Sequence, residues 1–285
     1  MSSLICTFVR MKQAMIFAAG LGTRLKPLTD TMPKALVRVG GEPLLKHVIL
    51  RLKAAGYTRI IVNVHHFASQ IVDYLREQNN FDLDIRISDE TEALLETGGG
   101  IKKAIPLFSD EAPILIHNVD VLDNVDYGWF SRQCLDDEDA VLLVSRRKTK
   151  RYLLFDNAMR LMGWANVETG EVKSPYDWIR SAEITDVDWD NYRLILGNDS
   201  NLSPLTSQSS PLMYNMFAFS GIHSFSPRLF PLMERFPDRF PIIDFYLSTC
   251  HRAHIVGLVK DDLRMLDVGK LDSLEQAERF LESTI

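Results

Sequence analysis

The sequence predicts an α/β protein with a mostly parallel central sheet, helices on both faces and a smaller β-rich portion. Three observations lead to this prediction. Short apolar runs alternate with segments of helical spacing through the first half of the 285-residue chain. A stretch rich in Gly, Pro and Thr follows the first apolar run directly. After about residue 145 the pattern changes to hairpins and polar turns.

The elements of the first half follow one another in the order of βαβ units. The first predicted strand is a short apolar run of the kind that is buried in a parallel sheet, and the third alternates in character. The first predicted helix has apolar residues at helical spacing and ends at Gly56, a typical helix stop. Strands are expected at 14–18, 59–64, 83–87, 113–117 and 140–144, and helices at 44–55, 67–78, 98–105 and 125–135. This order predicts a Rossmann-like sheet.

The second half contains fewer regular signals. Residues 152–155 and 159–163 predict a hairpin, and the polar, turn-rich stretch 166–211 predicts an insertion loop or lid. Further strands are expected at 213–225 and 254–259, and helices at 226–235, 241–251 and 272–282. We therefore expect an N-terminal tail over 1–13 and a single domain over 14–285, with halves 14–145 and 146–285.

Composition narrows the class of protein. Hydrophobic residues make up 46% and charged residues 25% of the chain, enough for a substantial core. The net charge of −6 argues against a nucleic-acid partner. Cys6, Cys134 and Cys250 lack metal-ligand spacing, which predicts reduced thiols in a cytoplasmic protein. No apolar run is long enough to span a bilayer, and the N-terminus does not resemble a signal peptide, so no membrane partner is expected.

The strongest local signal lies between residues 18 and 36. Two glycines follow the first strand, and glycines let backbone N–H groups approach phosphate oxygens. Arg24 offers a rigid fork of donors, and Lys34 a mobile point charge, so together they could neutralise a triphosphate. A P-loop is excluded because its Gly-x4-Gly-Lys-Ser/Thr run is absent. A dinucleotide fingerprint is excluded because Leu25 replaces its third glycine and Pro27 would interrupt the helix.

A carboxylate follows the fourth predicted strand. Asp120 comes just after the apolar run 113–117, and ligands of open α/β sheets bind at the carboxyl ends of the strands. A carboxylate at that edge can hold Mg²⁺, which takes oxygen ligands and bridges phosphates. The alternative is that Asp120 has a structural role only, as a loop aspartate that caps the next element.

The glycine-rich run resembles the signature of the sugar-1-phosphate nucleotidylyltransferases, G-x-G-T-R-x2-P-L-T followed by P-K-x-L, from Gly20 to Leu36. The resemblance implies that the loop wraps the nucleotide phosphates and that Arg24 and Lys34 are catalytic cations that bind triphosphate and pyrophosphate. The implied nucleotide-binding residues in this run are Ala18, Ala19, Gly20, Gly22, Thr23 and Arg24. Asp120 matches the Mg²⁺ ligand of the family's N-G-D or N-A-D motif, with Val119 at the small middle position.

Three later segments, at 94–101, 219–227 and 266–269, are similar to the same family in outline. Leu266 to Gly269 resembles the segment with the second metal ligand, here Asp267, although Met265 and Lys270 replace the usual Trp and Thr. The Leu-Glu-Thr-Gly-Gly-Gly segment is spelled most like N-acetylmuramate 1-phosphate uridylyltransferases and implies nucleotide contacts. The nucleotide set is completed by Glu96, Thr97, Gly98 and Asn118, and the implied sugar contacts are Gly99, Gly221 and Lys173.

The expected function is the Mg²⁺-dependent transfer of a nucleoside monophosphate from UTP or GTP to a sugar 1-phosphate. Mannose 1-phosphate guanylyltransferases of short form are the other relatives that the motifs resemble. Two alternatives remain open at this point: a non-catalytic regulator that binds sugar nucleotides, and a cytidylyltransferase that acts on phosphocholine. The sequence leaves the sugar, the base and the oligomeric state open.

Overall fold

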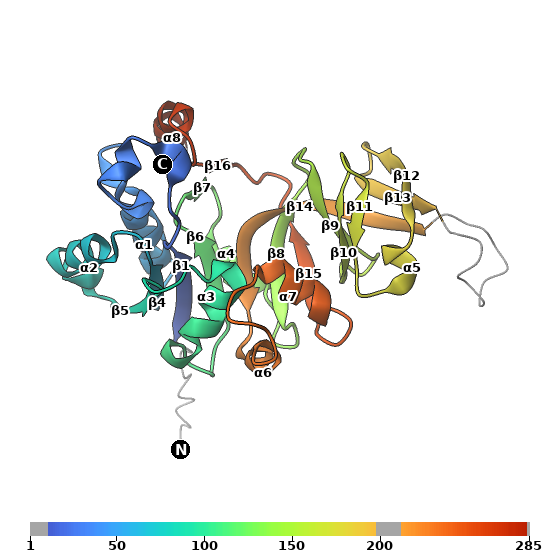
Figure 1. Ribbon diagram of the computed structural model, residues 1–285, viewed down its shortest axis with the longest axis horizontal. Helices are drawn as coiled ribbons and strands as arrows, with labels where there is room; N and C mark the ends of the chain where they lie inside the picture. Colours follow the sequence, from blue (N-terminus) through green and yellow to red (C-terminus); the bar gives the residue numbers. More distant parts are fainter. Residues whose placement is uncertain (1–10, 198–211, 284–285) are drawn as a thin grey trace, which may run out of the picture.

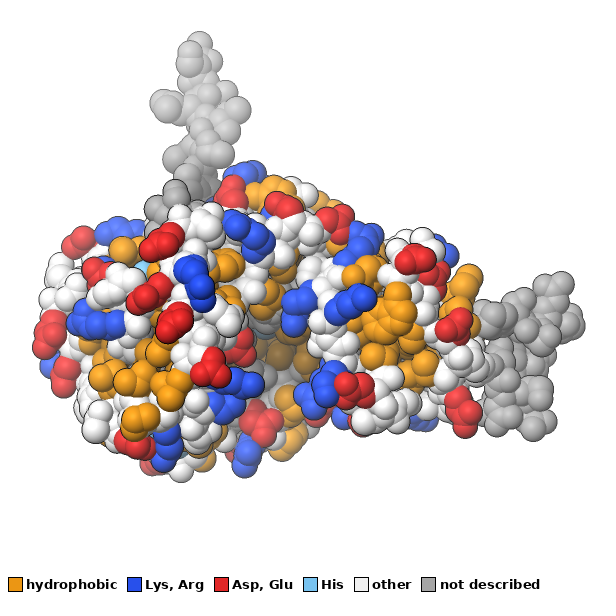
Figure 2. All heavy atoms as spheres, turned by 90° about the horizontal axis from the view of Figure 1, so that it is seen from above, with side chains coloured by type: hydrophobic (Ala, Val, Ile, Leu, Met, Phe, Trp, Pro, Cys, Tyr) orange, Lys and Arg blue, Asp and Glu red, His pale blue; other side chains and the backbone are white. Residues whose placement is uncertain are grey.

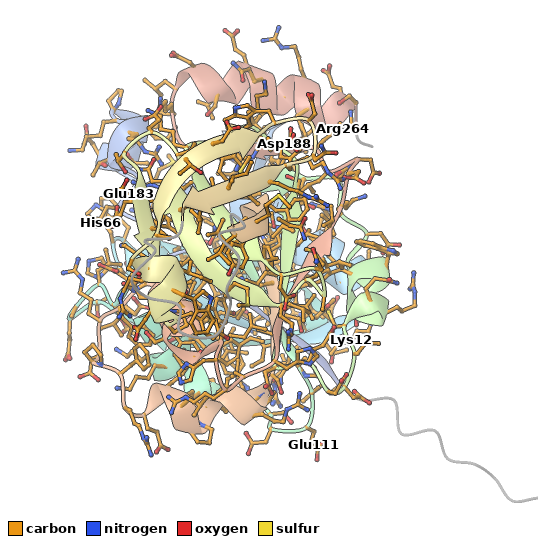
Figure 3. All side chains as sticks on the ribbon, turned by 90° about the vertical axis from the view of Figure 1, so that its right-hand side faces the viewer. Lys12, His66, Glu111, Glu183, Asp188 and Arg264 are labelled. Atoms are coloured by element: carbon orange, nitrogen blue, oxygen red, sulfur yellow. The ribbon has the colours of Figure 1, made fainter. Side chains whose placement is uncertain are left out.

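The computed structural model describes residues 11–197 and 212–283. Figure 1 shows an elongated molecule, with a larger helix-covered portion on one side and a smaller β-rich portion on the other. The N-terminal end of the described chain and the C-terminal helix lie at opposite ends of the larger portion. Figure 3 shows the same separation, because Lys12 lies far from Arg264 in that view.

The larger portion is built on a block of parallel strands. Their order in the sheet is β5 (Asp84–Asp89), β4 (Tyr57–Val64), β1 (Lys12–Phe17) and β6 (Ile114–Asn118). In the register, Phe17 lies opposite both Asn63 and Asn118, so three strands end at one edge. The predicted parallel core is confirmed, and this edge is where a ligand is expected.

Beyond β6 the sheet becomes mixed. β14 (Leu212–Phe225) pairs antiparallel with both β6 and β8 (Ala140–Ser145), and β15 (Ile255–Val259) pairs parallel with β8. The reason is that β14 enters from the β-rich portion and runs back along the parallel block. Its first half pairs with strands of the β-rich portion, so this one strand belongs to both portions of the sheet.

Helices cover both faces of the sheet, as predicted. One face packs against α1 (Leu44–Ala54), α2 (Ala68–Glu77), α4 (Tyr127–Gln133) and α8 (Asp272–Glu282). The other packs against α3 (Glu96–Ala104), α6 (Phe230–Met233) and α7 (Ile242–Thr249). Strand β1 feeds both cores, because Ala14 and Ile16 point to the first and Met15 to the second.

The β-rich portion contains the predicted hairpin and more. Its elements are β9 (Arg151–Phe155), β10 (Leu161–Asn166), β11 (Glu171–Lys173), α5 (Asp177–Arg180), β12 (Glu183–Asp188) and β13 (Arg193–Gly197). The prediction of a loop or lid over 166–211 is therefore wrong for 171–197, and 198–211 lie outside the described residues. Leu194 and Leu196 are buried in a core of this portion, whereas β12, with Glu183 and Asp188 at its ends, lies on its outer side (Figure 3).

A short ribbon joins the end of the chain to the sheet edge. β7 (Val121–Asp123) pairs antiparallel with β16 (Met265–Asp267). Shorter elements are β2 (Arg38–Val39), β3 (Glu42–Pro43) and the 3₁₀ turns at Thr23–Leu25, Leu28–Asp30, Lys34–Leu36, Asn79–Asp82, Ile105–Leu107 and Pro227–Leu229. Among the described residues, no helix has the length and apolar character needed to cross a membrane.

Candidate active site

A cavity of about 290 Å³ lies at the carboxyl ends of the parallel strands. Seen from above, the surface is hollowed between the larger and the smaller portions (Figure 2). The predicted site residues that line this cavity are Ala18, Ala19, Gly20, Lys34, Glu96, Thr97, Asn118 and Asp120. The other lining residues are Phe17, Asn63, Glu90, Leu94 and Val119. Segments far apart in the sequence are therefore brought together at the predicted edge.

Two glycines of the loop differ in what they do. Gly20 leaves space beside the backbone, and Gly22 adopts a conformation that the turn requires. A Cβ on Gly20 would meet no heavy atom within 4 Å, so its backbone is free for close approach. Gly22 has φ +63°, and its carbonyl accepts hydrogen bonds from Leu25 N and Thr29 Oγ1, both at 2.8 Å. Gly22 thus shapes the turn that begins the 3₁₀ segment carrying Thr23.

The amides of Ala18 and Ala19 are already engaged. They donate to the side-chain oxygen of Asn63 at 2.7 and 3.3 Å. Both residues line the cavity, as expected of nucleotide-binding residues, but their amides hold the loop to β4 and do not face the cavity as free donors. Amides available to a phosphate begin at Gly20.

Lys34 lies between the two predicted metal carboxylates. Its ammonium group forms an ion pair with Asp120 and lies 3.9 Å from Oδ1 of Asp267. Its side chain is only 8% exposed, against 24% for Asp120 and 57% for Asp267. The expectation of a mobile charge at Lys34 is therefore wrong, because burial and two carboxylates hold the ammonium group in place. The carbonyl of Asp120 also accepts a hydrogen bond from Val268 N at 2.8 Å.

Arg24 stands on the solvent side of this arrangement. It is exposed, and a Cβ on Gly269 would lie 3.0 Å from Arg24 Nη2 and 2.6 Å from Asp267 Oδ1. The guanidinium group and the Asp267 carboxylate therefore flank the same backbone position. This places Arg24 beside the carboxylate pair, where it can reach a phosphate group that approaches from solvent.

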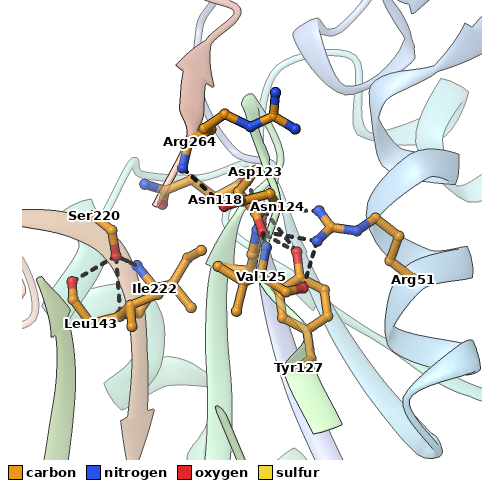
Figure 4. A network of polar contacts seen from close by, with 11 residues as sticks. Arg51, Asn118, Asp123, Asn124, Val125, Tyr127, Leu143, Ser220, Ile222 and Arg264 are labelled. Carbon is orange, nitrogen blue, oxygen red and sulfur yellow. Dashed lines mark hydrogen bonds and ion pairs between the residues drawn. The ribbon is translucent and has the colours of Figure 1, made fainter. Parts of the chain in front are cut away.

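Gly221 lies on a β-bulge in β14 that approaches Asn118. The register with β8 shifts between Phe219 and His223, and Gly221 has φ +85°. Ser220 Oγ donates to Leu143 O at 2.7 Å and fixes the bulge (Figure 4). A Cβ on Gly221 would lie 2.8 Å from Asn118 Nδ2. The structure thus brings a predicted sugar residue against a predicted nucleotide residue.

The glycines of α3 serve packing. A Cβ on Gly98 would lie 2.3 Å from the Phe240 ring, and one on Gly99 would lie 2.1 Å from Asp238 O. Both amides donate to Phe240 O, at 2.9 and 3.2 Å. Neither glycine lines the cavity, so the expected nucleotide contact at Gly98 and sugar contact at Gly99 are replaced by a close approach between α3 and the chain before α7.

The residues before those glycines do face the cavity. Glu96 has φ +63° and forms an ion pair with Arg239 at 3.1 Å. Thr97 Oγ1 accepts a hydrogen bond from Ile242 N at 2.9 Å, which ties the start of α3 to the start of α7. Glu96 and Thr97 thus stay candidates for nucleotide contact, with their side chains held by the second half of the chain.

Lys173 lies in a different hollow from Asp120. It lines a cavity of about 380 Å³ together with Trp164, Phe219 and the first residues of α7. Its ammonium group lies 5.1 Å from the centre of the Trp164 ring and 3.4 Å from Glu171. Phe219, which lines this hollow, precedes Gly221 by two positions in β14, and none of the residues that line this hollow lines the Asp120 cavity.

Sequence reasoning missed two buried polar residues of the site. Asn63 Nδ2 donates to Glu90 Oε1 at 2.7 Å, and Glu90 Oε2 accepts from Leu95 N at 3.1 Å. Both side chains line the cavity, and Glu90 is fully buried. The available signal was a polar residue at the carboxyl end of each of two neighbouring apolar strands. Val119, the departure from the family motif, is buried in the core as well as lining the cavity.

Within residues 11–197 and 212–283, no group of three or more His, Cys, Asp or Glu side chains could hold a metal ion by itself. The fold and the site together define an α/β protein with a candidate ligand site: an open glycine loop, a carboxylate pair and a cavity lie at the carboxyl edge of a parallel sheet. Residues 13–152 match the model of the nucleotidyl transferase family. We assign this part of the chain to that family.

Relatives of known activity match the same half of the chain. N-acetylmuramate alpha-1-phosphate uridylyltransferase from Caulobacter vibrioides is 49% identical over 111 residues, which are 38% of this chain and 46% of that protein. The enzyme of the same name from Neisseria meningitidis is 44% identical over 115 residues, 40% of this chain and 49% of that protein. Mannose-1-phosphate guanyltransferase from Emericella nidulans is 38% identical over 112 residues, 39% and 30% of the two chains. The match thus spans about half the length of the first two relatives.

Solved structures extend the likeness to the whole fold. The inositol-1-phosphate CTP transferase from T. maritima superposes with a TM-score of 0.66 at 14% identity, over 96% of this chain and 98% of that one. A UDP-glucose pyrophosphorylase in complex with UDP-glucose gives 0.64 at 13% identity, over 96% and 100%. At this identity the likeness concerns the fold, and it confirms the predicted α/β class with its parallel core.

Proposed function

We propose that the protein transfers a nucleoside monophosphate from a nucleoside triphosphate to a sugar 1-phosphate and releases pyrophosphate. The observation that carries this proposal is the convergence of Lys34, Asp120 and Asp267 at the mouth of the cavity that the glycine loop lines. Family membership over residues 13–152 and the activities of the relatives support it. UTP is the first triphosphate to test, because the two uridylyltransferases are the more identical relatives; GTP is the second.

The donor set suits Mg²⁺. Two carboxylates from different segments face one another across a single ammonium group, and Mg²⁺ is commonly bound by one or two carboxylates with substrate phosphates and water. Asp120 and Asp267 would hold the ion, which when bound would neutralise charge on the phosphate oxygens. Lys34 compensates part of the negative charge of the two carboxylates and holds them at the mouth of the cavity.

The chemistry is a single displacement at phosphorus. An oxygen of the sugar phosphate attacks the α-phosphorus, the bond from that phosphorus to the bridging oxygen breaks, and pyrophosphate leaves with the electron pair. The attacking oxygen is already ionised at neutral pH, so the site needs no general base. Arg24 would bind the pyrophosphate oxygens, and Gly20 N–H would approach the phosphates. Catalysis would come from positioning and electrostatics.

The acceptor would lie across the bulge from the nucleotide. Asn118 lines the cavity of Asp120 and lies against Gly221 of the bulge, whereas Trp164 and Lys173 line the other hollow. An aromatic ring beside a cation suits a sugar that carries a phosphate. The predicted sugar role of Lys173 is therefore kept as a proposal in this second hollow.

Pyrophosphate release tests the proposal. Purified protein is mixed with Mg²⁺, each of the four triphosphates in turn, and a panel of sugar 1-phosphates plus phosphocholine. We expect release that requires one triphosphate and one sugar 1-phosphate. Release only with CTP and phosphocholine would show the cytidylyltransferase alternative instead. Tight binding of a sugar nucleotide without release from any pair would show the regulator alternative.

A further inference from the structure

A buried polar cluster is built from residues on both sides of Asp120 in the chain; Figure 4 shows Arg51, Asp123 and Tyr127 of this cluster. It consists of Arg51 from α1, His117 from β6, Asp123 at the end of β7 and Tyr127 from α4, and we call it the Asp123 cluster. The side chains of His117 and Asp123 are 0% exposed, and that of Arg51 is 34% exposed. None of the four lines the cavity, so the mechanism proposed above does not use them directly.

The Asp123 carboxylate is saturated with hydrogen bonds. Arg51 binds it through two nitrogens, each at 2.9 Å, and Val125 N donates to it at 2.8 Å. Tyr127 Oη donates at 2.9 Å, and His117 Nε2 lies 3.0 Å away. Burial alone would raise the pKa of Asp123, but hydrogen bonds from His117 and Arg51 hold it well below its usual range. A fixed anion with this many partners permits little movement.

One arm of the cluster reaches the start of the Asp120 segment. His117 Nδ1 lies 2.7 Å from the carbonyl oxygen of Asn118. Only Val119 and Asp120 separate β6 from β7. The cluster therefore contacts the chain on both sides of this two-residue link. His117 contacts Asn118 just before it, and Asp123 is the last residue of β7 just after it.

A second arm reaches Asp267. In the ribbon, Asp123 lies opposite Met265, and Val121 lies opposite Asp267. Asp120 O accepts a hydrogen bond from Val268 N, which joins the two segments at the site. The strand that ends at Asp267 is thus paired along its length with β7, which ends at Asp123.

We propose that the Asp123 cluster sets the spacing between the Asp120 and Asp267 carboxylates, and that Arg51, His117, Asp123 and Tyr127 are positioning residues for metal-assisted transfer. The inference rests on the proposed function, because it assigns the two carboxylates to one divalent cation. Mg²⁺ demands near-ideal octahedral geometry, so a small change in carboxylate spacing weakens binding. Groups that orient metal ligands typically change metal affinity or activity by about 10- to 100-fold when removed.

Binding of Mn²⁺, followed by electron paramagnetic resonance with a non-hydrolysable UTP analogue present, tests the cluster independently of turnover. The variants are Asp123→Asn and the milder Tyr127→Phe, which removes a single hydroxyl. The matched control is Asp139→Asn, which changes the same group in the ion pair with Arg228 at 2.8 Å, away from the cavity. Tyr127→Phe should weaken Mn²⁺ binding by about 10-fold, and Asp123→Asn by up to about 100-fold.

Turnover adds a second readout. In each cluster variant, kcat for pyrophosphate release should fall by about the same factor as Mn²⁺ binding. KM for the triphosphate should stay within about twofold of the wild-type value, because the cluster orients the metal ligands and does not touch the nucleotide. Asp139→Asn should change the melting temperature alone.

The positioning role would be overturned if Tyr127→Phe bound Mn²⁺ as tightly as the wild type and only its melting temperature fell, as in the control. This outcome would be decisive even if Asp123→Asn did not fold. No Mn²⁺ binding by the wild-type protein would overturn both the cluster and the metal assignment. Mn²⁺ binding that follows the expected order, without pyrophosphate release from any triphosphate, would support the cluster and contradict the proposed transfer.

Discussion

The ammonium group of Lys34 lies 3.9 Å from the Oδ1 atom of Asp267. The same nitrogen is ion-paired with Asp120, so one nearly buried cation serves two carboxylates from distant parts of the chain. The guanidinium group of Arg24 also flanks Asp267, so two carboxylates meet two cations at this edge of the sheet. Because the two carboxylates come from distant segments, each can be tested by a substitution of its own.

Asp120→Asn should remove most turnover and leave the fold intact. The substitution keeps the size of the side chain and removes the charge that would hold the metal. We expect kcat for pyrophosphate release to fall by about 10²- to 10³-fold, as when a group that stabilises transition-state charge is lost. Asp267→Asn should act in the same direction. Asp262→Asn, an exposed change in the same C-terminal region, is the control. Turnover near the wild-type rate in Asp120→Asn would contradict the metal assignment.

Gly20→Ala should separate binding from folding. A Cβ at Gly20 meets no protein atom within 4 Å, so the melting temperature should stay within about 2 °C of the wild type. The same Cβ would obstruct a phosphate, so KM for the triphosphate should rise about 10-fold, or about 1.4 kcal/mol of lost binding. Gly98→Ala is the contrasting variant, because its Cβ would lie 2.3 Å from Phe240. It should lower stability by about 1–3 kcal/mol. Unchanged triphosphate kinetics in Gly20→Ala would count against the glycine loop as the phosphate site.

Gly221→Ala should lower stability by more than backbone strain alone explains, and it should raise KM for the sugar 1-phosphate. Gly221 and Gly170 both have positive φ, +85° and +75°, so alanine at either costs roughly 1 kcal/mol of stability. Only at Gly221 would the Cβ meet a neighbour, Asn118 Nδ2 at 2.8 Å. Chemical unfolding and acceptor kinetics should therefore show a larger stability loss and a raised KM for the sugar 1-phosphate in Gly221→Ala, but strain alone in Gly170→Ala. Equal behaviour of the two variants would remove the bulge from the site.

His223→Leu should flatten the pH dependence of stability. His223 is buried in β14, and neither ring nitrogen has a hydrogen-bond partner among the described residues. Burial lowers its pKa from 6.5 to about 3 and outweighs the opposing effect of the Gly221 backbone. Between these values the unfolded chain binds the proton and the folded chain does not. The wild-type free energy of unfolding should therefore fall as pH decreases from 6.5, by at most about 1.4 kcal/mol per pH unit from this group.

The leucine variant should lose this contribution and equal or exceed the wild type in stability below pH 6, because an apolar side chain replaces an unpartnered polar one. Urea unfolding at several pH values measures the slope. His66→Leu, a change at an exposed histidine, should keep the wild-type slope. A slope in His223→Leu as steep as in the wild type would show that other groups cause it.

The sequence by itself determined the parallel core and the position of the site along it. Apolar runs such as 59–64 and 113–117 and the glycine-rich turn after β1 are local signals, because strand propensity and phosphate approach depend on neighbouring residues. The same local chemistry indicated Gly20 and Asp120 at the carboxyl edge. The roles of these residues stay predictions until the substitutions above are made.

The tertiary structure alone decided which groups are already engaged. The burial of Lys34, the use of the Ala18 amide by Asn63 and the packing of Gly98 on Phe240 depend on contacts between segments far apart in the chain. The strands within 171–197 escaped prediction because they are short and their outer faces are polar. Each strand therefore contains few buried apolar residues, and the alternating pattern that would identify it is weak. The Asp123 cluster likewise exists only where α1, β6, β7 and α4 meet, and no spacing in the sequence encodes that distance.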